Sequence, residues 1–332
     1  MKNNTVFIGI DVSKTTLDVC IVEQNEKKVF LTLKNKEKAI GSFCKKIAKK
    51  YATKCMKIAM ENTGHYNWNT YAVLDKLDIE LYVINPLHLK RSMGLVRGKN
   101  DKVDSERIAD FLIKNNTLKP FKIPQKGIRK MQILVAQRNR LVNTKKSLLV
   151  AVKEVKYLDD KVFYKMLEKE NRKLEKVLIE AIKETETQLQ QIIEQDLELT
   201  KQYHLITSVP GVGKVVAWEL LIKTNAFKSI SDPRKLACYS GVVPFEYQSG
   251  TSVFKRPRVS VYADRKLKKL LHMAALRVIQ IKGELQTYYL RKVAEGKNKM
   301  LVINALRNKI VQRVCAVIKN QTNYTDFSLQ VS

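Results

Sequence analysis

Four acidic residues stand where an oxygen-liganded metal site can form. Asp11 ends a short apolar run, FIGID, and Glu61 ends another, IAME, so both fall at the ends of expected strands. Asp101 and Asp104 are three residues apart where a helix is expected to start, which places both on one helix face. Carboxylates hold hard cations such as Mg²⁺ or Mn²⁺, and two such ions support in-line displacement at a phosphodiester. The four residues therefore predict a catalytic two-metal site.

Two of these acids also have an ordinary structural explanation. Asp104 is a suitable residue to cap or open its helix and Asp11 to begin a turn, and for either residue alone that explanation is favoured. Two strand ends and a helix start in one topological order favour the metal site. Other acids lack this placement and are expected on the surface: Asp18, Asp75, Asp78 and Asp110.

A glycine-containing segment, KLACYSGVVPFEYQSGTSVFKRPR, carries Ser240, Ser249 and Ser252 close to basic residues. Composition alone assigns Ser249, which precedes Gly250, to a turn. An unassisted hydroxyl is a weak nucleophile unless a base or a metal lies beside it. From the residues alone, a catalytic serine is therefore the less favoured alternative.

A second glycine motif, SVPGVGK, contains Gly211, Gly213 and Lys214 between two apolar segments. It has the sequence form of a helix-hairpin-helix, which binds duplex phosphate through main-chain amides, although an ordinary turn is the alternative. Residues 263–315 carry 13 Lys and Arg against 3 Asp and Glu. The side chains expected to contact phosphate are Lys255, Arg256, Arg258, Arg265, Lys268 and Lys269, with Lys90, Arg91 and Arg97 as an alternative footprint.

The composition favours a nucleic-acid partner. The 332 residues include 62 Lys and Arg against 32 Asp and Glu, which gives a net charge of +30. Such a surplus repels itself unless a polyanion neutralises it, so nucleic acid is favoured over an anionic membrane surface. Every apolar stretch is far shorter than the ~20 residues of a membrane helix, and the first residues do not resemble a signal peptide, which predicts an intracellular protein. The scattered Cys and His residues do not predict a zinc site.

Residues 1–122 alternate strand and helix patterns in the order βββαβαβ. TVFIGIDVS, TLDVCIVE and KVFLTLKN predict three antiparallel strands, and KIAMEN and IELYVIN predict parallel strands joined by helices. A mixed sheet with helices on its faces is the α/β topology of the ribonuclease H-like nucleases. In such a sheet the strands that end in Asp11 and Glu61 are neighbours, so the two carboxylates meet at one edge.

The rest of the chain is expected to be helical. Residues 123–200 repeat apolar positions every seven residues, which is typical of a coiled coil. The acidic surplus of residues 159–200 argues against phosphate contact there and for self-association, which charged substitutions at Leu178, Ile182 and Leu189 would weaken. Two helices packed within one subunit are the alternative. Residues 201–332 form a mainly helical C-terminal domain with the helix-hairpin-helix-like motif and the serine segment.

Five motifs together resemble the DEDD transposases of the insertion-sequence one-hundred-and-ten family, which are similar to the Piv-type DNA invertases. The motifs are GIDVSK, ENTGHY, KNDKVD, SVPGVG, and YSGVVP followed by QSG. The resemblance implies an N-terminal RuvC-like domain, a coiled-coil middle and a C-terminal transposase domain. It implies that Ser249 is the nucleophile and that divalent metal is bound by Asp11, Glu61, Asp101 and Asp104.

The resemblance further implies a site-specific recombinase that forms a phosphoserine link to DNA and is guided to target and donor DNA by a structured bridge RNA. It implies a tetramer with active sites that can combine residues of different subunits, in the cytoplasm of a prokaryote and at its nucleoid. The chain departs from the family at Ala263, Asp264 and Arg265, where relatives usually show a Gly-Asn pair. The alternatives are a hydrolytic RuvC-like junction nuclease and a catalytically silent nucleic-acid-binding protein.

Overall fold

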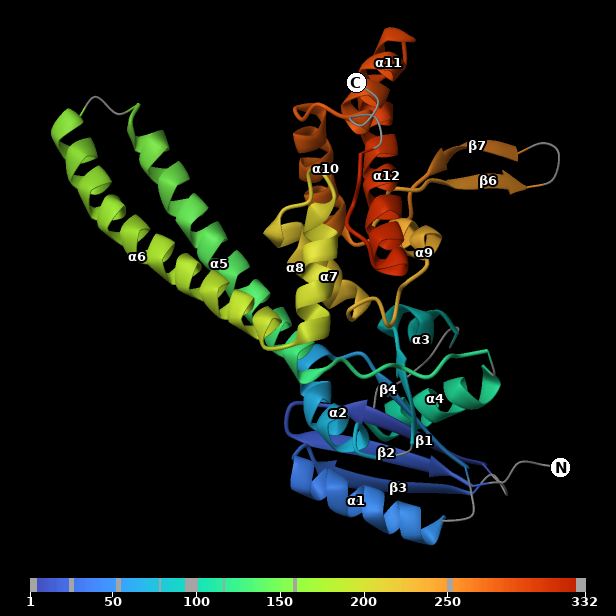
Figure 1. Ribbon diagram of the computed structural model, residues 1–332. Helices are drawn as coiled ribbons and strands as arrows, with labels where there is room; N and C mark the ends of the chain where they lie inside the picture. Colours follow the sequence, from blue (N-terminus) through green and yellow to red (C-terminus); the bar gives the residue numbers. More distant parts are fainter. Residues whose placement is uncertain are drawn as a thin grey trace. The chain divides into compact units, whose positions relative to one another are not determined.

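The computed structural model describes residues 5–23, 27–51, 55–77, 79–92, 101–115, 117–157, 160–249 and 253–326 (Figure 1). The side chains of Asp101, of residues 247–249 and of residues 253–256 lie outside this description. The chain forms two compact units, Met1–Ile123 and Pro124–Ser332. The expected division into three parts, with boundaries after residues 122 and 200, stays a prediction.

The first unit is built on a five-stranded mixed sheet with the strand order β3-β2-β1-β4-β5. The strands are β1 (Thr5–Val12), β2 (Thr16–Val22), β3 (Lys28–Lys34), β4 (Cys55–Glu61) and β5 (Glu80–Ile84). β1 pairs antiparallel with β2 and parallel with β4. The predicted mixed α/β sheet is therefore confirmed, and it is consistent with a ribonuclease H-like fold.

The helical segments of this unit are α1 (Glu37–Lys50), the 3-10 turn η1 (Gly64–Asn67), α2 (Trp68–Leu74), α3 (Pro86–Ser92) and α4 (Asp101–Lys114). Alternating side chains of β1 divide between the two faces of the sheet. Val6, Ile8 and Ile10 are buried with apolar side chains of α1 and α2, whereas the opposite face packs with α4. Figure 1 shows α1 and α4 on opposite sides of the sheet.

Helix α4 approaches the sheet closely at Gly9. A Cβ atom built on Gly9 would lie 2.1 Å from the carbonyl oxygen of Ser105 and 2.5 Å from the backbone nitrogen of Ala109. Cβ atoms do not come this near to backbone atoms, so only glycine allows the helix to lie in this position. The contact fixes α4 above β1, two residues before Asp11.

The second unit, in its described residues, is helical apart from one β-hairpin. Its helices are α5 (Lys126–Val155), α6 (Lys161–Glu194), α7 (Leu197–Ser208), α8 (Lys214–Thr224), α9 (Pro233–Tyr239), α10 (Arg265–Ile279), α11 (Glu284–Ala294) and α12 (Lys299–Asn320). The hairpin consists of β6 (Phe245–Ser249) and β7 (Val253–Arg258). None of the described helices has both the length and the apolarity that crossing a bilayer requires.

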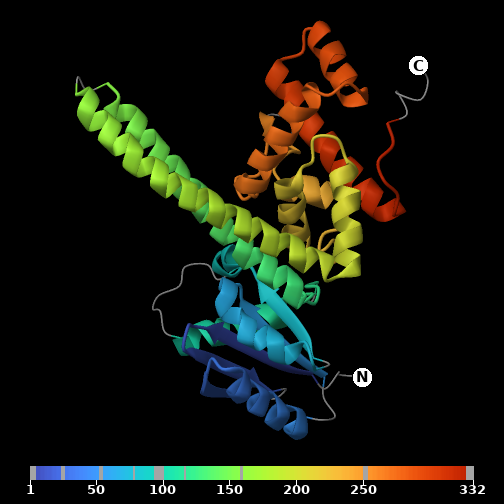
Figure 2. The same ribbon diagram turned by 60° about the vertical axis from the view of Figure 1, so that its left-hand side comes forward.

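Helices α5 and α6 form a long antiparallel hairpin (Figure 2). At its base, Ile128 and Met131 of α5 are buried with Leu189 and Ile193 of α6, and this cluster continues into α7, α8, α10 and α12. The sevenfold apolar positions near this base therefore pack within one chain, which was the alternative to self-association. A coiled-coil supercoil stays a prediction.

Candidate functional site

Asp11 and Glu61 are neighbours at one edge of the sheet. The parallel register pairs Ile8 with Ile58 and Ile10 with Met60, so the next residues along β1 and β4 are Asp11 and Glu61. Both side chains are partly exposed. Because alternate residues of a strand share a face, Asp11 lies on the same face as Gly9, the face that α4 covers.

Helix α4 begins near this edge. Asp101 is its first residue, although the side chain of Asp101 lies outside the described residues. Lys102 and Ser105, within the first turns of α4, line a cavity of ≈ 220 Å³ together with Asp18 of β2 and Thr32 of β3. The N-terminal turns of α4 therefore lie against the polar ends of the strands.

Asp104 is held by an ion pair on its own helix. Its Oδ1 lies 2.8 Å from Nη1 of Arg107, and the side chains are 24% and 18% exposed. A metal ion bound by Asp104 would have to compete with this guanidinium. Among the described residues, no three His, Cys, Asp or Glu side chains lie close enough to hold a metal ion. The four-carboxylate site, which includes Asp101, stays a prediction.

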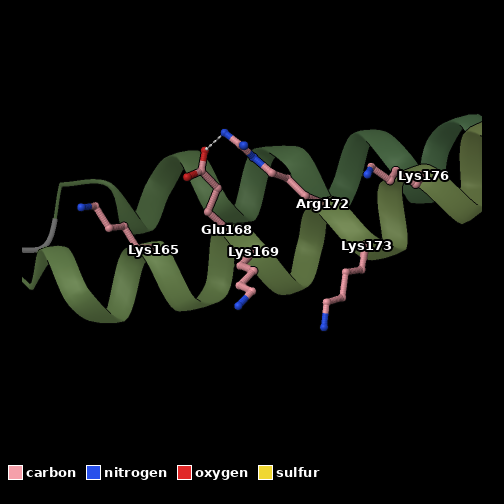
Figure 3. A pocket seen from close by; sticks show the side chains of 6 residues that line it. All are labelled: Lys165, Glu168, Lys169, Arg172, Lys173 and Lys176. Atoms are coloured by element: carbon pink, nitrogen blue, oxygen red, sulfur yellow. Dashed lines mark hydrogen bonds and ion pairs between the residues drawn. The ribbon is translucent and has the colours of Figure 1, made fainter.

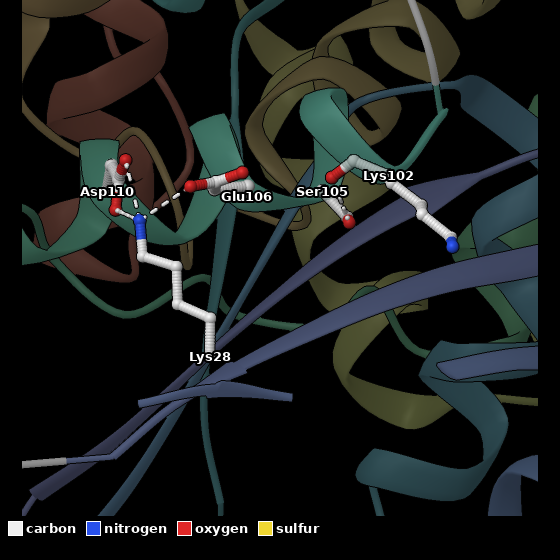
Figure 4. A network of polar contacts seen from close by, with 5 residues as sticks. All are labelled: Lys28, Lys102, Ser105, Glu106 and Asp110. Carbon is white, nitrogen blue, oxygen red and sulfur yellow. Dashed lines mark hydrogen bonds and ion pairs between the residues drawn. The ribbon is translucent and has the colours of Figure 1, made fainter. Parts of the chain in front are cut away.

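Two other acids of α4 anchor the helix to the sheet. Nζ of Lys28 lies 2.7 Å from Oε1 of Glu106 and 3.2 Å from Oδ1 of Asp110 (Figure 4). The hydrogen bond with Glu106 is the main reason that the pKa of Lys28 lies above its ordinary value. Nearby, burial raises the pKa of the Cys20 thiol to about 11. Glu106 and Asp110 therefore position the helix, and their role differs from the one predicted for Asp101 and Asp104.

Asp18 is a carboxylate beside the site that sequence reasoning missed. In the antiparallel register of β1 and β2 it lies directly opposite Asp11, and residues so paired project from the same face. Oγ1 of Thr32 donates a hydrogen bond to Asp18 at 2.6 Å. The tight turn within DVSKTTLD, which joins the two strands, is the signal that could have revealed this register. The sheet edge therefore carries a row of three carboxylates, Asp18, Asp11 and Glu61.

Ser249 is the last residue of β6, and its backbone pairs with Val253 at the start of β7. It therefore stands where the hairpin enters its tip. Residues 250–252 lie outside the described residues, and so do the side chains of Ser249, Lys255 and Arg256. The structure does not test the nucleophile predicted here.

Ser240, in contrast, has a structural environment. It is fully buried, and its Oγ donates a hydrogen bond to the carbonyl oxygen of Ala237 at 3.1 Å. A hydroxyl that is buried and already bonded to the backbone cannot reach a DNA phosphate without unfolding the end of α9. The structure therefore argues against Ser240 as an accessible serine of this segment.

The two glycines of SVPGVGK face different surroundings. Gly211 has φ +80°, and a Cβ atom there would lie 2.4 Å from Cγ2 of Val278, so this glycine packs against α10. Gly213 immediately precedes α8, and a Cβ atom there would meet nothing within 4 Å. No side chain caps the start of α8. Gly213 is therefore the part of the turn that a phosphate could approach, and the helix-hairpin-helix stays a prediction.

Lys214, one of the predicted phosphate contacts, is held in an ion pair. Its Nζ lies 2.6 Å from Oε2 of Glu186 on α6, and Nε of Arg138 lies 2.6 Å from Oε1 of the same carboxylate. Partial burial disfavours the charge on Glu186, but the hydrogen bonds from Lys214 and Arg138 outweigh it, so the pKa of Glu186 lies below its ordinary value. A phosphate that binds Lys214 would compete with Glu186.

The departure from the family at residues 263–265 forms the start of α10. Asp264 accepts a hydrogen bond from the N–H of Leu267 at 2.8 Å and lies 2.8 Å from Nζ of Lys223. An Asp in this position stabilises a helix N-terminus. Among the predicted phosphate contacts, Arg258, Arg265 and Lys269 are exposed and Lys268 is half-buried. In the alternative footprint, Lys90 and Arg91 lie on α3, and Arg97 lies outside the described residues.

Charge is divided unevenly along α6. Residues 161–176 carry six basic and three acidic side chains, whereas residues 177–194 carry one basic and four acidic side chains. Lys165, Lys169, Lys173 and Lys176 surround a shallow hollow on the basic half, with the ion pair of Arg172 and Glu168 at 2.9 Å (Figure 3). The acidic surplus that argues against phosphate contact therefore belongs to the second half of α6 and not to the first.

Comparisons with known proteins agree with the fold and the motifs. A family model for DEDD transposases of the IS110 type matches residues 8–155, and a model described as transposase IS116/IS110/IS902 family matches residues 203–290. The chain is 27% identical over 330 residues to the pilin gene-inverting protein of Moraxella lacunata, which covers 94% of this chain and 95% of that protein. It is 30% identical over 122 residues to the insertion element IS110 uncharacterized 43.6 kDa protein of Streptomyces coelicolor, 36% of this chain and 29% of that protein. The chain therefore belongs to the IS110 (insertion-sequence one-hundred-and-ten) family of transposases, which are enzymes that act on DNA.

Proposed function

We propose that this transposase cuts and rejoins DNA strands through a covalent phosphoserine intermediate, with the assistance of a divalent metal. Asp11, Glu61, Asp101 and Asp104 hold Mg²⁺ or Mn²⁺, and Ser249 supplies the nucleophile. The register of β1 and β4, which makes Asp11 and Glu61 neighbours, is the observation that supports the proposal most. Carboxylates at the ends of neighbouring strands are the kind of donor that a hard cation prefers.

The serine step exchanges one phosphate ester for another. The hydroxyl oxygen of Ser249 forms a bond to phosphorus, the bond from phosphorus to a deoxyribose oxygen breaks, and the serine proton ends on the departing oxygen. Attack by a hydroxyl of a second strand then reverses the step, so strands are rejoined without an external energy source. Bound metal would polarise the phosphate and stabilise the departing oxygen. The Moraxella relative is named for inverting a gene, and inversion requires strands to be rejoined as well as cut.

The proposal includes two partners, a structured bridge RNA and further copies of this chain in a tetramer. A net charge of +30 leaves enough basic surface for two nucleic acids. In a tetramer, Ser249 of one subunit can act at the carboxylates of another. Sequencing the RNA that copurifies with the full-length protein tests the RNA partner. We expect one structured segment from the DNA flanking the gene, and a recovery of random cellular RNA would contradict guidance.

The arm formed by α5 and α6 offers an apolar surface for self-association. Val162, Met166, Leu174 and Val177 are 81%, 48%, 52% and 63% exposed, and their spacing keeps them on one side of α6. We expect the triple variant Val162→Glu, Leu174→Glu and Val177→Glu to sediment as a smaller species. Burial of the three carboxylates in an interface is unfavourable, so this surface should stay exposed to water. Its helicity, measured by circular dichroism, should not change.

The matched control for the arm is Leu189→Glu. Leu189 is fully buried within the chain, so a charge there should destabilise the fold by about 3 kcal/mol or more and lower the melting temperature. A charged substitution at Leu189 therefore tests folding before it tests assembly, whereas Leu178 and Ile182 are only partly buried. An unchanged sedimentation coefficient in the Val162, Leu174 and Val177 variant would exclude this surface as the interface.

Asp18 provides a test of the metal site that does not remove a predicted ligand. Its carboxylate faces the same way as that of Asp11, so it adds negative potential where the cation binds. We expect Asp18→Asn to raise the Mg²⁺ concentration needed for half-maximal cleavage by about tenfold. Thr32→Val removes the hydrogen-bond donor but keeps the charge, so its effect should be smaller. If Asp18→Asn and the unmodified enzyme need the same Mg²⁺ concentration, Asp18 has a structural role and does not influence metal binding.

A further inference from the structure

A cluster of basic side chains lies between α10 and α12 of the second unit and consists of Lys268, His272 and Arg307. Arg307 of α12 is only 7% exposed. Its Nη2 lies 2.6 Å from Nδ1 of His272 on α10, and its Nη1 lies 3.4 Å from Oδ1 of Asn304. Its Nε is buried and has no hydrogen-bond partner among the described residues. Because a guanidinium only donates, Nδ1 of His272 must accept, which leaves the histidine proton on Nε2.

This cluster has no anionic partner in the described part of the chain. No carboxylate lies within ion-pair distance of Arg307 or Lys268 there, whereas other cations of the same helices are paired: Lys266 with Glu219 at 2.8 Å and Arg313 with Glu284 at 2.7 Å. Burial, and then the charge of Arg307, lowers the pKa of both Lys268 and His272. Burial also lowers the pKa of Arg307. A buried cation without a counter-charge is costly, so the cluster would be stabilised by a bound anion.

The cluster is attached to the segment that leads into the serine hairpin. A Cβ atom on Gly241 would lie 3.6 Å from Cδ of Lys268, so the lysine stem lies against this glycine. Nδ2 of Asn304 donates a hydrogen bond to the carbonyl oxygen of Val242 at 2.8 Å. Only two residues separate Val242 from β6, which ends at Ser249. An anion held by the cluster would therefore be positioned against the root of the hairpin.

We infer that Lys268, His272 and Arg307 bind one phosphate of the DNA strand beside the root of the serine hairpin, an inference that rests on the proposed function. Lys268 and His272 are partly exposed, and the buried Arg307 supplies a permanent charge. The three donors suit the oxygens of a phosphodiester, and such contacts fix the register of a strand without reading its sequence. The site is a positioning site and takes no part in bond exchange.

Arg307→Met separates binding from folding, because methionine has a similar length and no charge. If the arginine is structural, the variant should lose stability; if it awaits an anion, the variant should fold at least as well as the unmodified protein. Inorganic phosphate is the probe, with chloride at the same ionic strength as the reference. We expect phosphate to raise the melting temperature of the full-length protein, and to lose this effect in Arg307→Met and Lys268→Gln.

Duplex DNA binding across a salt series provides the second measurement. We expect Lys268→Gln and Arg307→Met each to flatten the slope of log affinity against log salt by about 0.9, the value for one phosphate contact. Arg277→Gln is the matched control, because Arg277 lies on the same helix, is exposed and bonds only to Gln280 in the described chain. It should change neither slope nor phosphate effect.

Two results would overturn the inference. One is an unchanged DNA slope and phosphate effect in Arg307→Met. The other is a flattened slope for structured RNA with an unchanged slope for DNA, which would assign the site to RNA phosphates. The phosphate measurement does not require catalysis. If the phosphoserine proposal fails, the unmodified enzyme forms no adduct. If this site fails, the phosphate effect is unchanged in Arg307→Met, so the two failures are distinguishable.

Discussion

Ser249→Ala should form no covalent adduct with DNA, while its affinity for DNA and for metal stays that of the unmodified enzyme. The expected loss of adduct is about a thousandfold or more, because removal of a nucleophile removes the covalent route and not merely a contact. The measurement is a denaturing gel of the full-length protein with labelled DNA. Ser249 is the last residue of β6 and is not part of the helical core of the second unit, so its replacement should leave that core intact.

The other serines of the segment are the controls for this experiment. Ser240→Ala removes one buried hydrogen bond, to Ala237, and should cost about 1 kcal/mol of stability while the adduct persists. Ser252→Ala should also retain the adduct. An adduct in Ser249→Ala would reassign the nucleophile. If the active unmodified enzyme cuts DNA and shows no adduct, the serine mechanism is wrong and the acids activate water, as in a hydrolytic RuvC-like nuclease.

Asp11→Asn and Glu61→Gln should each reduce strand cleavage by at least about a thousandfold and leave DNA binding within a few-fold. The amides keep the size of the side chains but remove the charges that attract a divalent cation. Excess chelator should reduce the unmodified enzyme to the same level, and Mg²⁺ or Mn²⁺ should restore it. Gel-shift binding and cleavage of the same labelled DNA separate the two effects.

Asp110→Asn is the matched control on α4. This carboxylate pairs with Lys28 at 3.2 Å and is 37% exposed, so its replacement should cost little stability and little cleavage. Equal losses in Asp110→Asn and Asp11→Asn would indicate that the sheet edge tolerates no change in charge and would remove the evidence for a metal site. Full cleavage in excess chelator would contradict metal dependence directly.

The fold of the first unit could be predicted because its sequence alternates strand patterns and helix patterns in the order βββαβαβ, which is typical of a mixed α/β sheet. The runs that end near Asp11 and Glu61 contain consecutive buried apolar residues, and such runs become neighbouring central strands. The helical seam at Leu189 was more difficult, because a sevenfold apolar repeat has the same pattern whether its partner is in the same chain or in another. The burial of Leu189 together with Ile128 and Met131 of α5 decides in favour of the same chain.

Parts of the site depend on information that spacing does not contain. Asp18 joins the row of carboxylates through the exact register of one hairpin, and a shift by one residue would move it to the opposite face. Arg307 is buried with no carboxylate nearby in the described part of the chain, and only the packing of α10 and α12 determines this environment. Net charge along a segment also misleads when the two signs occupy different halves of one helix, as in α6.

Gly9 makes the distance between two backbones a dimension of the predicted metal site. Because the carbonyl group of Ser105 occupies the space of a β-carbon, no side-chain layer separates β1 from α4 at this point. The gap is therefore set by the sizes of peptide groups, which do not change with sequence. The contact therefore fixes the distance between the strand-end carboxylates and the first turn of the helix. A methyl group at position 9 would increase this distance, so the ionic radius that the predicted metal site accepts would depend on a residue that has no atom with which to bind an ion.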